Sequence, residues 1–182
     1  DATRLSERGW RALRGRRIAL VSQDALAALD PLRRVGAEVA EPMVIHDLAR
    51  SQRSERVIEL LERVAMPDAA RRARAYPHEL SGGLRQRALI ASALAGEPDV
   101  LVADEATTAL DATVQARVLA LLRQIADAGT AVLFISHDFA AVSQVADRVV
   151  VMRGGRIDEE GPVAHVQSAP QDDYTRRLVA PT

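Results

Sequence analysis

The sequence predicts an α/β fold in which a mostly parallel sheet is flanked by helices. Three short apolar runs, residues 18–22, 100–103 and 131–135, have the length and composition of buried strands. In the second half of the chain these runs alternate with stretches of helical periodicity, a pattern typical of parallel sheets with helices on their faces. The long stretch between the first two runs predicts an α-helical subdomain.

The first half of the chain is expected to contain helices and loops after its first strand. Residues 25–42 predict loop and one short helix, because helix-interrupting residues occur along the segment: Asp30-Pro31, Gly36 and Pro42. Ser54 is expected to cap a helix that Pro67 ends. Apolar residues with helical spacing share one face of that helix: Val57, Leu60, Leu61 and Val64. The next helix is expected to run from Leu84 to about Gly96.

The second half predicts helices after each strand and a hairpin near the end. Asp111 is expected to cap a helix that Gly129 closes. Its apolar face consists of Val114, Val118, Leu121, Leu122 and Ile125. Residues 139–146 predict a helix, and residues 149–157 predict a hairpin around two glycines. From Gly161 onward we expect a polar tail with one short helix.

Composition excludes several classes of function. The chain has 182 residues and 48% hydrophobic content, enough for one globular domain with a core. It has no cysteine, which excludes disulfide frameworks and iron–sulfur clusters. A net charge of -1 provides no overall basic field for nucleic acid or anionic lipid. No apolar run approaches membrane-spanning length.

Polar side chains follow the predicted strands at the points where the strands end. Asp104 and Glu105 end an apolar run, where two carboxylates cost desolvation unless a cation compensates, and carboxylate oxygens are ligands that Mg²⁺ prefers. Gln23 and His137 follow the other two strands. Parallel sheets place ligands at the carboxyl ends of their strands, so these side chains are expected to converge. An acidic pair that merely caps the next helix is the alternative.

A Ser-Gly-Gly turn precedes the predicted helix at Leu84. In Ser81-Gly82-Gly83 the glycines let backbone amides approach an anion closely, and the helix that follows adds its positive dipole. The turn therefore predicts a phosphate contact. An ordinary glycine-containing helix start is the alternative.

The order and spacing of these motifs resemble the nucleotide-binding domain of ABC transporters. The segments that carry the resemblance are Leu80–Leu84 (signature motif), Val100–Glu105 (Walker B), Ala109-Leu110-Asp111 (D-loop), Ser136-His137-Asp138 (H-loop) and Gln23 (Q-loop). Leu84 replaces the usual glutamine, Ala106 the usual proline, and Ala25 the proline of peptide importers. Residues 155–162 and 173–176 resemble the tail of the oligopeptide, dipeptide and nickel importer group.

The resemblance implies a P-loop NTPase-like fold that binds ATP and Mg²⁺. Glu105 would be the general base and His137 a second catalytic residue that contacts the γ-phosphate. Asp104 and Gln23 would serve the metal. Residues 81–83 would grip a nucleotide held by the opposite subunit. The implied nucleotide-binding positions are Gln23, Ser81, Gly82, Gly83, Asp104 and Asp111.

No G-x-x-x-x-G-K-[ST] phosphate loop occurs, because all 24 basic residues are arginine. The resemblance therefore implies that the N-terminal part of the fold is missing and that ATPase activity belongs to the full-length protein, with this chain alone inactive. The implied organisation is 1–24, a remnant of the ATPase core ending in the Q-loop; 25–96, helical subdomain and signature helix; 97–160, ATPase core; and 161–182, C-terminal tail.

The implied function is that of an ATP-binding, ATP-hydrolysing subunit of an ABC importer for peptides or similar small solutes. Its implied partners are a second nucleotide-binding domain in a head-to-tail homo- or heterodimer, membrane permease subunits and, indirectly, a solute-binding protein, with no nucleic acid. Its implied place is the cytoplasmic face of the cell membrane, as a peripheral protein. Two alternatives stay open: a non-catalytic partner that donates its signature motif in trans, and a DNA-maintenance ABC ATPase.

Overall fold

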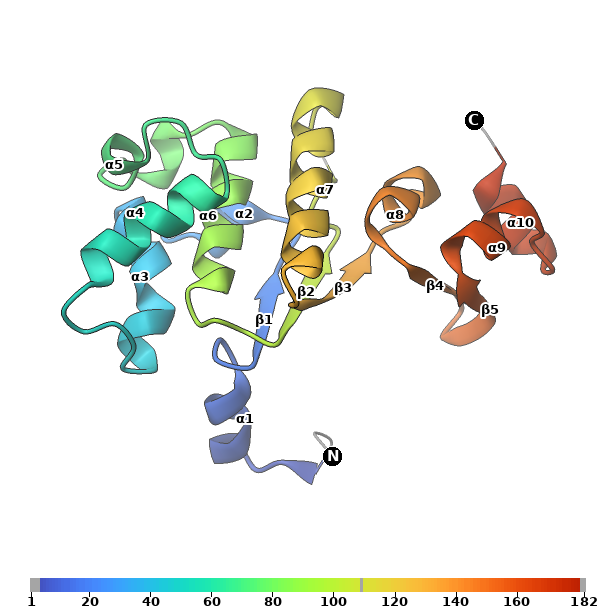
Figure 1. Ribbon diagram of the computed structural model, residues 1–182, viewed down its shortest axis with the longest axis horizontal. Coiled ribbons are helices and arrows are strands. Elements are labelled where there is room, and N and C mark those ends of the chain that lie inside the picture. The colour runs from blue at the N-terminus through green and yellow to red at the C-terminus, as the bar shows by residue number, and fades with distance from the viewer. Residues whose placement is uncertain (1–3, 109, 181–182) are drawn as a thin grey trace.

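A three-stranded parallel sheet lies at the centre of the molecule. The computed structural model describes residues 4–108 and 110–180. The strands β1 (Ile18–Val21), β2 (Val100–Asp104) and β3 (Ala131–Ile135) are adjacent in that order (Figure 1). All pair in parallel, with Val21 opposite Ala103 and Asp104 opposite Ile135. The predicted parallel sheet is therefore confirmed, and the carboxyl ends of its strands share one edge.

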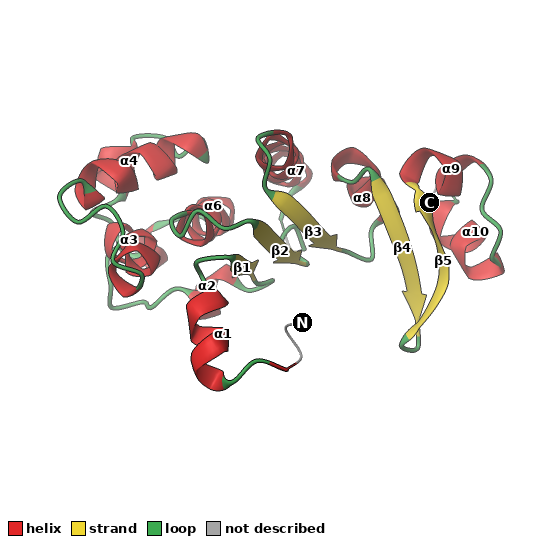
Figure 2. Cartoon of the chain, turned by 60° about the horizontal axis from the view of Figure 1, so that its bottom comes forward, coloured by secondary structure: helices red, strands yellow, loops and turns green. Residues whose placement is uncertain are grey.

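Helices cover one face of this sheet. Figure 2 shows α6 (Gly82–Leu94), α7 (Ala112–Asp127) and α8 (Phe139–Val145) on the same side of the strands. The strand residues that face them are buried: Ala19, Val21, Leu101 and Ala103. Alternation along a strand sends every second side chain to the other face.

The opposite face is apolar but uncovered. The side chains of Leu20, Leu133 and Ile135 are 60%, 54% and 44% exposed. Every residue of β3 is apolar, as in a central strand buried on both faces. In the described part of the chain, however, β3 pairs only with β2, and the nearby strand β4 (Arg148–Arg153) pairs only with β5 (Arg156–Pro162). The composition of β3 therefore predicts more burial than the structure gives it.

The other helices between β1 and β2 lie in one group with α6. They are α2 (Ala25–Ala28), α3 (Val35–Ile45), α4 (Arg53–Arg63), α5 (Ala69–Arg72) and the 3₁₀ turn η2 (Pro77–Glu79). Of these, α2, α3 and α4 pack directly against α6. The expected apolar face of α4 is buried: Val57, Leu60, Leu61 and Val64. The same apolar core continues along the covered face of the sheet to α7 and α8, so the boundaries at 24, 96 and 160 stay predictions.

Pro42 does not interrupt the segment 25–42 as expected; it lies inside α3, and so does Gly36. A proline in a helix cannot donate to the carbonyl four residues earlier, here that of Glu38. The Ser92 hydroxyl, from α6, donates to this carbonyl at 3.1 Å. The packing of α6 on α3 thus satisfies the acceptor that Pro42 leaves without a helical partner.

The start of α4 also differs from the prediction. Gln52 occupies the N-cap position and Ser54 lies in the first turn, so Ser54 is not the cap. The side chain of Arg53 donates from Nε to the Leu48 carbonyl at 3.0 Å, which ties the helix start to the preceding turn. Helix α6 begins two residues before the expected Leu84. By contrast, Asp111 caps α7 as predicted, accepting the Val114 N–H at 3.0 Å.

The C-terminal part is an antiparallel hairpin with two helices packed against it. Strands β4 and β5 confirm the predicted hairpin. Two helices follow where one was expected, α9 (Val163–Ser168) and α10 (Asp173–Val179). They bury a second small core made of Phe139, Val151, Val163 and Val166.

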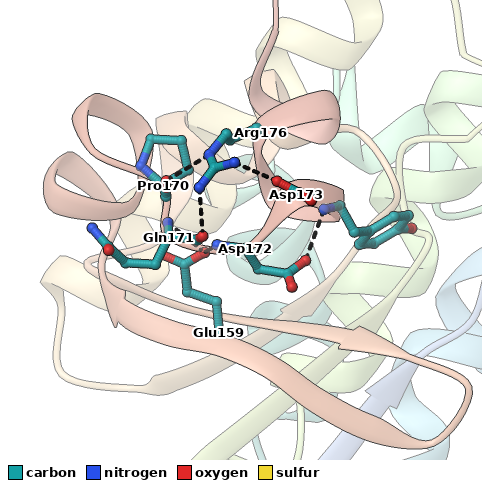
Figure 3. Close-up of polar contacts among 7 residues, drawn as sticks. Glu159, Pro170, Gln171, Asp172, Asp173 and Arg176 are labelled. Atoms are coloured by element: carbon teal, nitrogen blue, oxygen red, sulfur yellow. Dashed lines mark hydrogen bonds and ion pairs between the residues drawn. The ribbon is translucent and has the colours of Figure 1, made fainter.

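The segment between α9 and α10 is held by side chains that replace regular backbone pairing. The carboxylate of Glu159 accepts the N–H groups of Gln171 at 3.0 Å and Asp172 at 3.1 Å (Figure 3). Arg176 donates to the carbonyls of Pro170 and Gln171 and pairs with Asp173. The predicted polar tail therefore packs on the hairpin as an ordered cap.

One further helix, α1 (Glu7–Leu13), precedes β1 and lies apart from the other helices in Figure 1. Ser6 caps it, accepting the Gly9 N–H at 3.3 Å. Among the described helices the longest, α7, has 16 residues, and none has the length and apolar character needed to cross a membrane.

Candidate functional site

Glu105 stands directly after β2 in a conformation that turns the chain sharply. Its φ is +48°, in the left-handed region that residues other than glycine rarely adopt. Its N–H donates to the carbonyl of Ile135 at 2.9 Å, so the end of β3 holds the turn. Strained backbone often occurs at functional sites. Five other non-glycine residues of the described chain have positive φ as well, so the conformation of Glu105 gains meaning only from the side chains around it.

Side chains from three segments converge on the Glu105 carboxylate. Oε2 accepts hydrogen bonds from Gln23 Nε2 at 3.2 Å and from Thr108 Oγ1 at 3.0 Å. Oε1 lies 3.1 Å from His137 Nδ1. Gln23 follows β1, Glu105 follows β2 and His137 follows β3, so the shared edge of the parallel strands brings together residues far apart in sequence.

These contacts keep the carboxyl group ionised. The hydrogen bond from His137 lowers the pKa of Glu105 below its ordinary value, and the bond from Thr108 lowers this pKa further. Side chains of Glu105 and His137 are 30% and 73% exposed, so solvent or a ligand reaches them. An ionised, accessible carboxylate can accept a proton from a water molecule. Thr108 was not identified from the sequence as a partner of Glu105. The only indication in the sequence is that Thr108 follows Glu105 by three residues, a spacing at which a turn brings two side chains together.

Asp104 points away from this cluster. It is the last residue of β2 and shares the uncovered face with Val102 and Leu133, because alternate residues and register partners share a face. Its side chain is exposed. The described residues contain no group of three acidic or histidine side chains that could hold a metal ion by themselves. Mg²⁺ is commonly bound by one or two carboxylates together with waters and substrate phosphates, and the exposed carboxylate of Asp104 is a donor of that kind.

The Ser-Gly-Gly turn lies at another place, where α6 meets the start of α7. Ser81 is the N-cap of α6, is exposed, and makes no side-chain capping bond. A Cβ at Gly82 would meet open space, whereas a Cβ at Gly83 would overlap Cγ1 of Val114. Asp111 uses its carboxylate to cap α7. Ala109, the first residue of the expected D-loop, lies outside the described residues.

The geometry is that of a P-loop-type ATPase cassette, and comparisons with solved structures agree. The chain is similar to a post-hydrolysis dimer of the ATP-binding cassette MJ0796 bound to ADP and Pi (TM-score 0.76, 27% identity, 88% of this chain and 68% of that chain). It is also similar to cbiO1 from Clostridium perfringens, part of the ABC transporter complex cbiONQ (TM-score 0.79, 28% identity, 90% of this chain and 64% of that chain).

Sequence comparisons define the family. The model of the ABC transporter family matches residues 1–108, and the chain belongs to this family. It is 45% identical over 181 residues to a putative peptide import ATP-binding protein of Brucella ovis, covering 98% of this chain and 54% of that relative. It is 47% identical over 177 residues to a probable peptide ABC transporter ATP-binding protein of Sinorhizobium fredii, covering 96% and 53%. The chain thus spans about half the length of the curated relatives it matches.

Proposed function

We propose that the chain forms part of the ATP-binding, ATP-hydrolysing subunit of an ABC importer, with peptides or similar small solutes as its cargo. The observation that carries the proposal is the Glu105 carboxylate held between Gln23 and His137 at the shared edge of the parallel strands. The names of the two relatives support the peptide assignment.

In this proposal Glu105 is the general base of hydrolysis. Glu105 is ionised at neutral pH, and its side chain is 30% exposed, so a positioned water molecule can reach the carboxylate and pass it a proton. With one imidazole nitrogen directed at Glu105, the other nitrogen of His137 remains available to a phosphate. Gln23 couples the cluster to the helical segment, since its amide donates to Glu105 while its backbone leads into α2.

Asp104 and Gln23 would hold Mg²⁺, which neutralises charge on the phosphates when it is bound. The exposed carboxylate of Asp104 lies on the uncovered apolar face of the sheet. A phosphate-loop segment packed against that face would cover Leu20 and Leu133 and would bring nucleotide phosphates toward Asp104. A phosphate loop contains a lysine, and this chain has none, so such a segment would come from sequence outside the chain.

Residues 81–83 would contact the nucleotide of a second nucleotide-binding domain in a head-to-tail dimer. The start of α6 offers backbone N–H groups and open space at Gly82, and its N-cap residue Ser81 makes no capping hydrogen bond, so its hydroxyl is available. These features suit an anion. Asp111, at the adjacent start of α7, belongs to the same region. The Glu105 cluster lies at the strand ends, and the Ser-Gly-Gly turn lies at the helix starts. In a head-to-tail dimer, the cluster of each copy would face the turn of the other copy, which gives two complete sites.

The helical segment from Gln23 to about Pro77 would dock membrane permease subunits, and through them a solute-binding protein, at the cytoplasmic face of the cell membrane. Leu32 is 85% exposed, and Ile45 at the end of α3 is 67% exposed. Leu32 lies in the turn between α2 and α3, nine residues after Gln23, and this exposed apolar side chain suits a contact that senses the nucleotide. The names of the relatives favour neither alternative, the non-catalytic partner subunit that donates residues 81–83 in trans or the DNA-maintenance ATPase.

The test uses the longer protein that includes a phosphate loop. Glu105→Gln should preserve Mg-ATP binding and lower hydrolysis by about 10²–10⁴-fold, the usual contribution of a positioned base. Asp104→Asn should instead weaken Mg-dependent nucleotide binding. With ATP, only the Glu105→Gln protein should elute as a stable dimer on size exclusion. Hydrolysis at the parental rate in Glu105→Gln would remove the base role and favour the non-catalytic alternative.

A further inference from the structure

A cleft of about 320 Å³ opens between α4, α6 and α7, away from the strand ends. Three arginines line it, one from each helix: Arg63, Arg87 and Arg117. Its remaining lining is apolar or neutral: Val64, Ala65, Ala120, Leu121 and Gln124. The cleft therefore carries three positive charges and no negative charge.

Arg87 is unusual because its charge is buried. The residue is 7% exposed, and its Nη1 donates to the Ala65 carbonyl at 2.6 Å. Across residues 4–108 and 110–180, no carboxylate lies within ion-pair distance of this guanidinium. Burial, and then the neighbouring charge of Arg117, lower the pKa of Arg87. A buried charge without a counter-charge is costly, so the folded chain maintains this arrangement against an electrostatic penalty.

Two other, partly exposed arginines of the molecule do have carboxylate partners. The Arg33 guanidinium lies 3.0 Å from the carboxylate of the buried Glu38 and 2.7 Å from that of Glu41. Arg123 pairs with Asp127 at 2.6 Å and Asp147 at 3.1 Å. In the same described ranges, neither Arg63 nor Arg117 has an ion-pair partner. Other described arginines also lack an ion-pair partner, among them Arg72 and Arg85, so this cleft is distinguished by gathering three such side chains, one of which, Arg87, is buried.

We propose that the α4–α6–α7 cleft binds a compact oxyanion with two negative charges, namely inorganic phosphate or the phosphate group of a monoester. Guanidinium groups present paired N–H donors that match the oxygen geometry of phosphate. Three positive charges without an acid favour a dianion over a single carboxylate. The phosphate would supply the counter-charge that Arg87 lacks.

This site differs from the proposed nucleotide site in its elements. Its arginines come from the end of α4 and the interiors of α6 and α7, whereas Gln23, Glu105 and His137 follow the strands. The two proposals can therefore fail separately. Variants at Arg63 and Arg117 are suitable tests, because both side chains are exposed and neither makes a hydrogen bond or ion pair in the described part of the molecule.

The test is isothermal titration of the full chain with inorganic phosphate at constant ionic strength, with acetate as the monoanion control. We expect saturable phosphate binding and at least about 10-fold weaker binding in Arg63→Gln and in Arg117→Gln, since each loses charged hydrogen bonds. Arg177→Gln is the matched control, an exposed arginine of α10 with the same change of charge, and should bind like the parent. Circular dichroism verifies folding of each variant.

A parallel titration with glycerol 3-phosphate distinguishes the two sources of the phosphate group. Tighter binding of the monoester would identify an organic phosphate, and equal or tighter binding of inorganic phosphate would identify the free ion; either result supports the site. Absence of saturable phosphate binding would overturn the proposal. Equal loss in Arg117→Gln and Arg177→Gln would also overturn it, because the contact would then be an adventitious ion only.

Discussion

Gly83 offers a direct test of how the Ser-Gly-Gly turn is built. A methyl group at this position would overlap Cγ1 of Val114, closer than the 3.0 Å that real Cβ contacts respect. Valine in a helix has one strongly preferred rotamer, so Val114 cannot easily turn aside. We expect Gly83→Ala to push α6 and α7 apart. The neighbouring Gly82 meets open space and provides the matched control.

The magnitude follows from two opposing effects. Replacing glycine by alanine inside a helix stabilises a protein by about 0.5–1 kcal/mol. Overpacking a filled site costs about 1–3 kcal/mol. Gly82→Ala should show only the first effect. The difference in unfolding free energy between Gly83→Ala and Gly82→Ala should therefore be about 1–3 kcal/mol, with Gly83→Ala the less stable.

Urea unfolding followed by far-ultraviolet circular dichroism measures this difference. Combining Gly83→Ala with Val114→Ala removes the overlapping methyl groups, so the double variant should recover most of the lost stability as a coupling energy. Equal stabilities of the two single alanine variants, within about 0.5 kcal/mol, would refute the packing role of Gly83. The glycine at position 83 would then have to be explained by contact with a ligand alone.

Two further predictions concern carboxyl groups whose pKa is lowered in the folded chain. The contacts of Glu105 stabilise the fold above the ordinary carboxyl pKa of 4.5, and this stability is lost as pH falls through the lowered pKa. His137→Ala should therefore raise the pKa of Glu105 in a carbon-13 NMR titration; an unchanged pKa would contradict the contact. For Glu159, the N–H groups of Gln171 and Asp172 lower the pKa in the same sense. Glu159→Gln should speed hydrogen exchange at those two amides, and parental exchange rates would show that the carboxylate does not hold the cap.

Local features of the sequence were enough to place most strands and helices. Apolar runs and helical periodicity located the three parallel strands and α7, and Asp111 was identified as a cap because capping depends on the adjacent N–H groups. The positions of Gln23, Asp104, Glu105 and His137 after strands predicted that all four converge, since parallel strands end at a common edge. Gln23, Glu105 and His137 do meet, but strand alternation places the Asp104 side chain on the uncovered face of the sheet. Their catalytic and ligand roles stay predictions.

Long-range packing decided what the sequence could not. Pro42 is tolerated within α3 because a hydroxyl from α6, fifty residues away in sequence, donates to the Glu38 carbonyl. The overlap that requires glycine at position 83 depends on how closely α7 approaches α6. Tertiary contacts of this kind join side chains with no fixed spacing in sequence, so no local pattern reports them. The sequence by itself therefore determined which chemical groups stand at the strand ends and helix starts, and the tertiary structure decided which groups meet and which, like Arg87, are buried without a counter-charge.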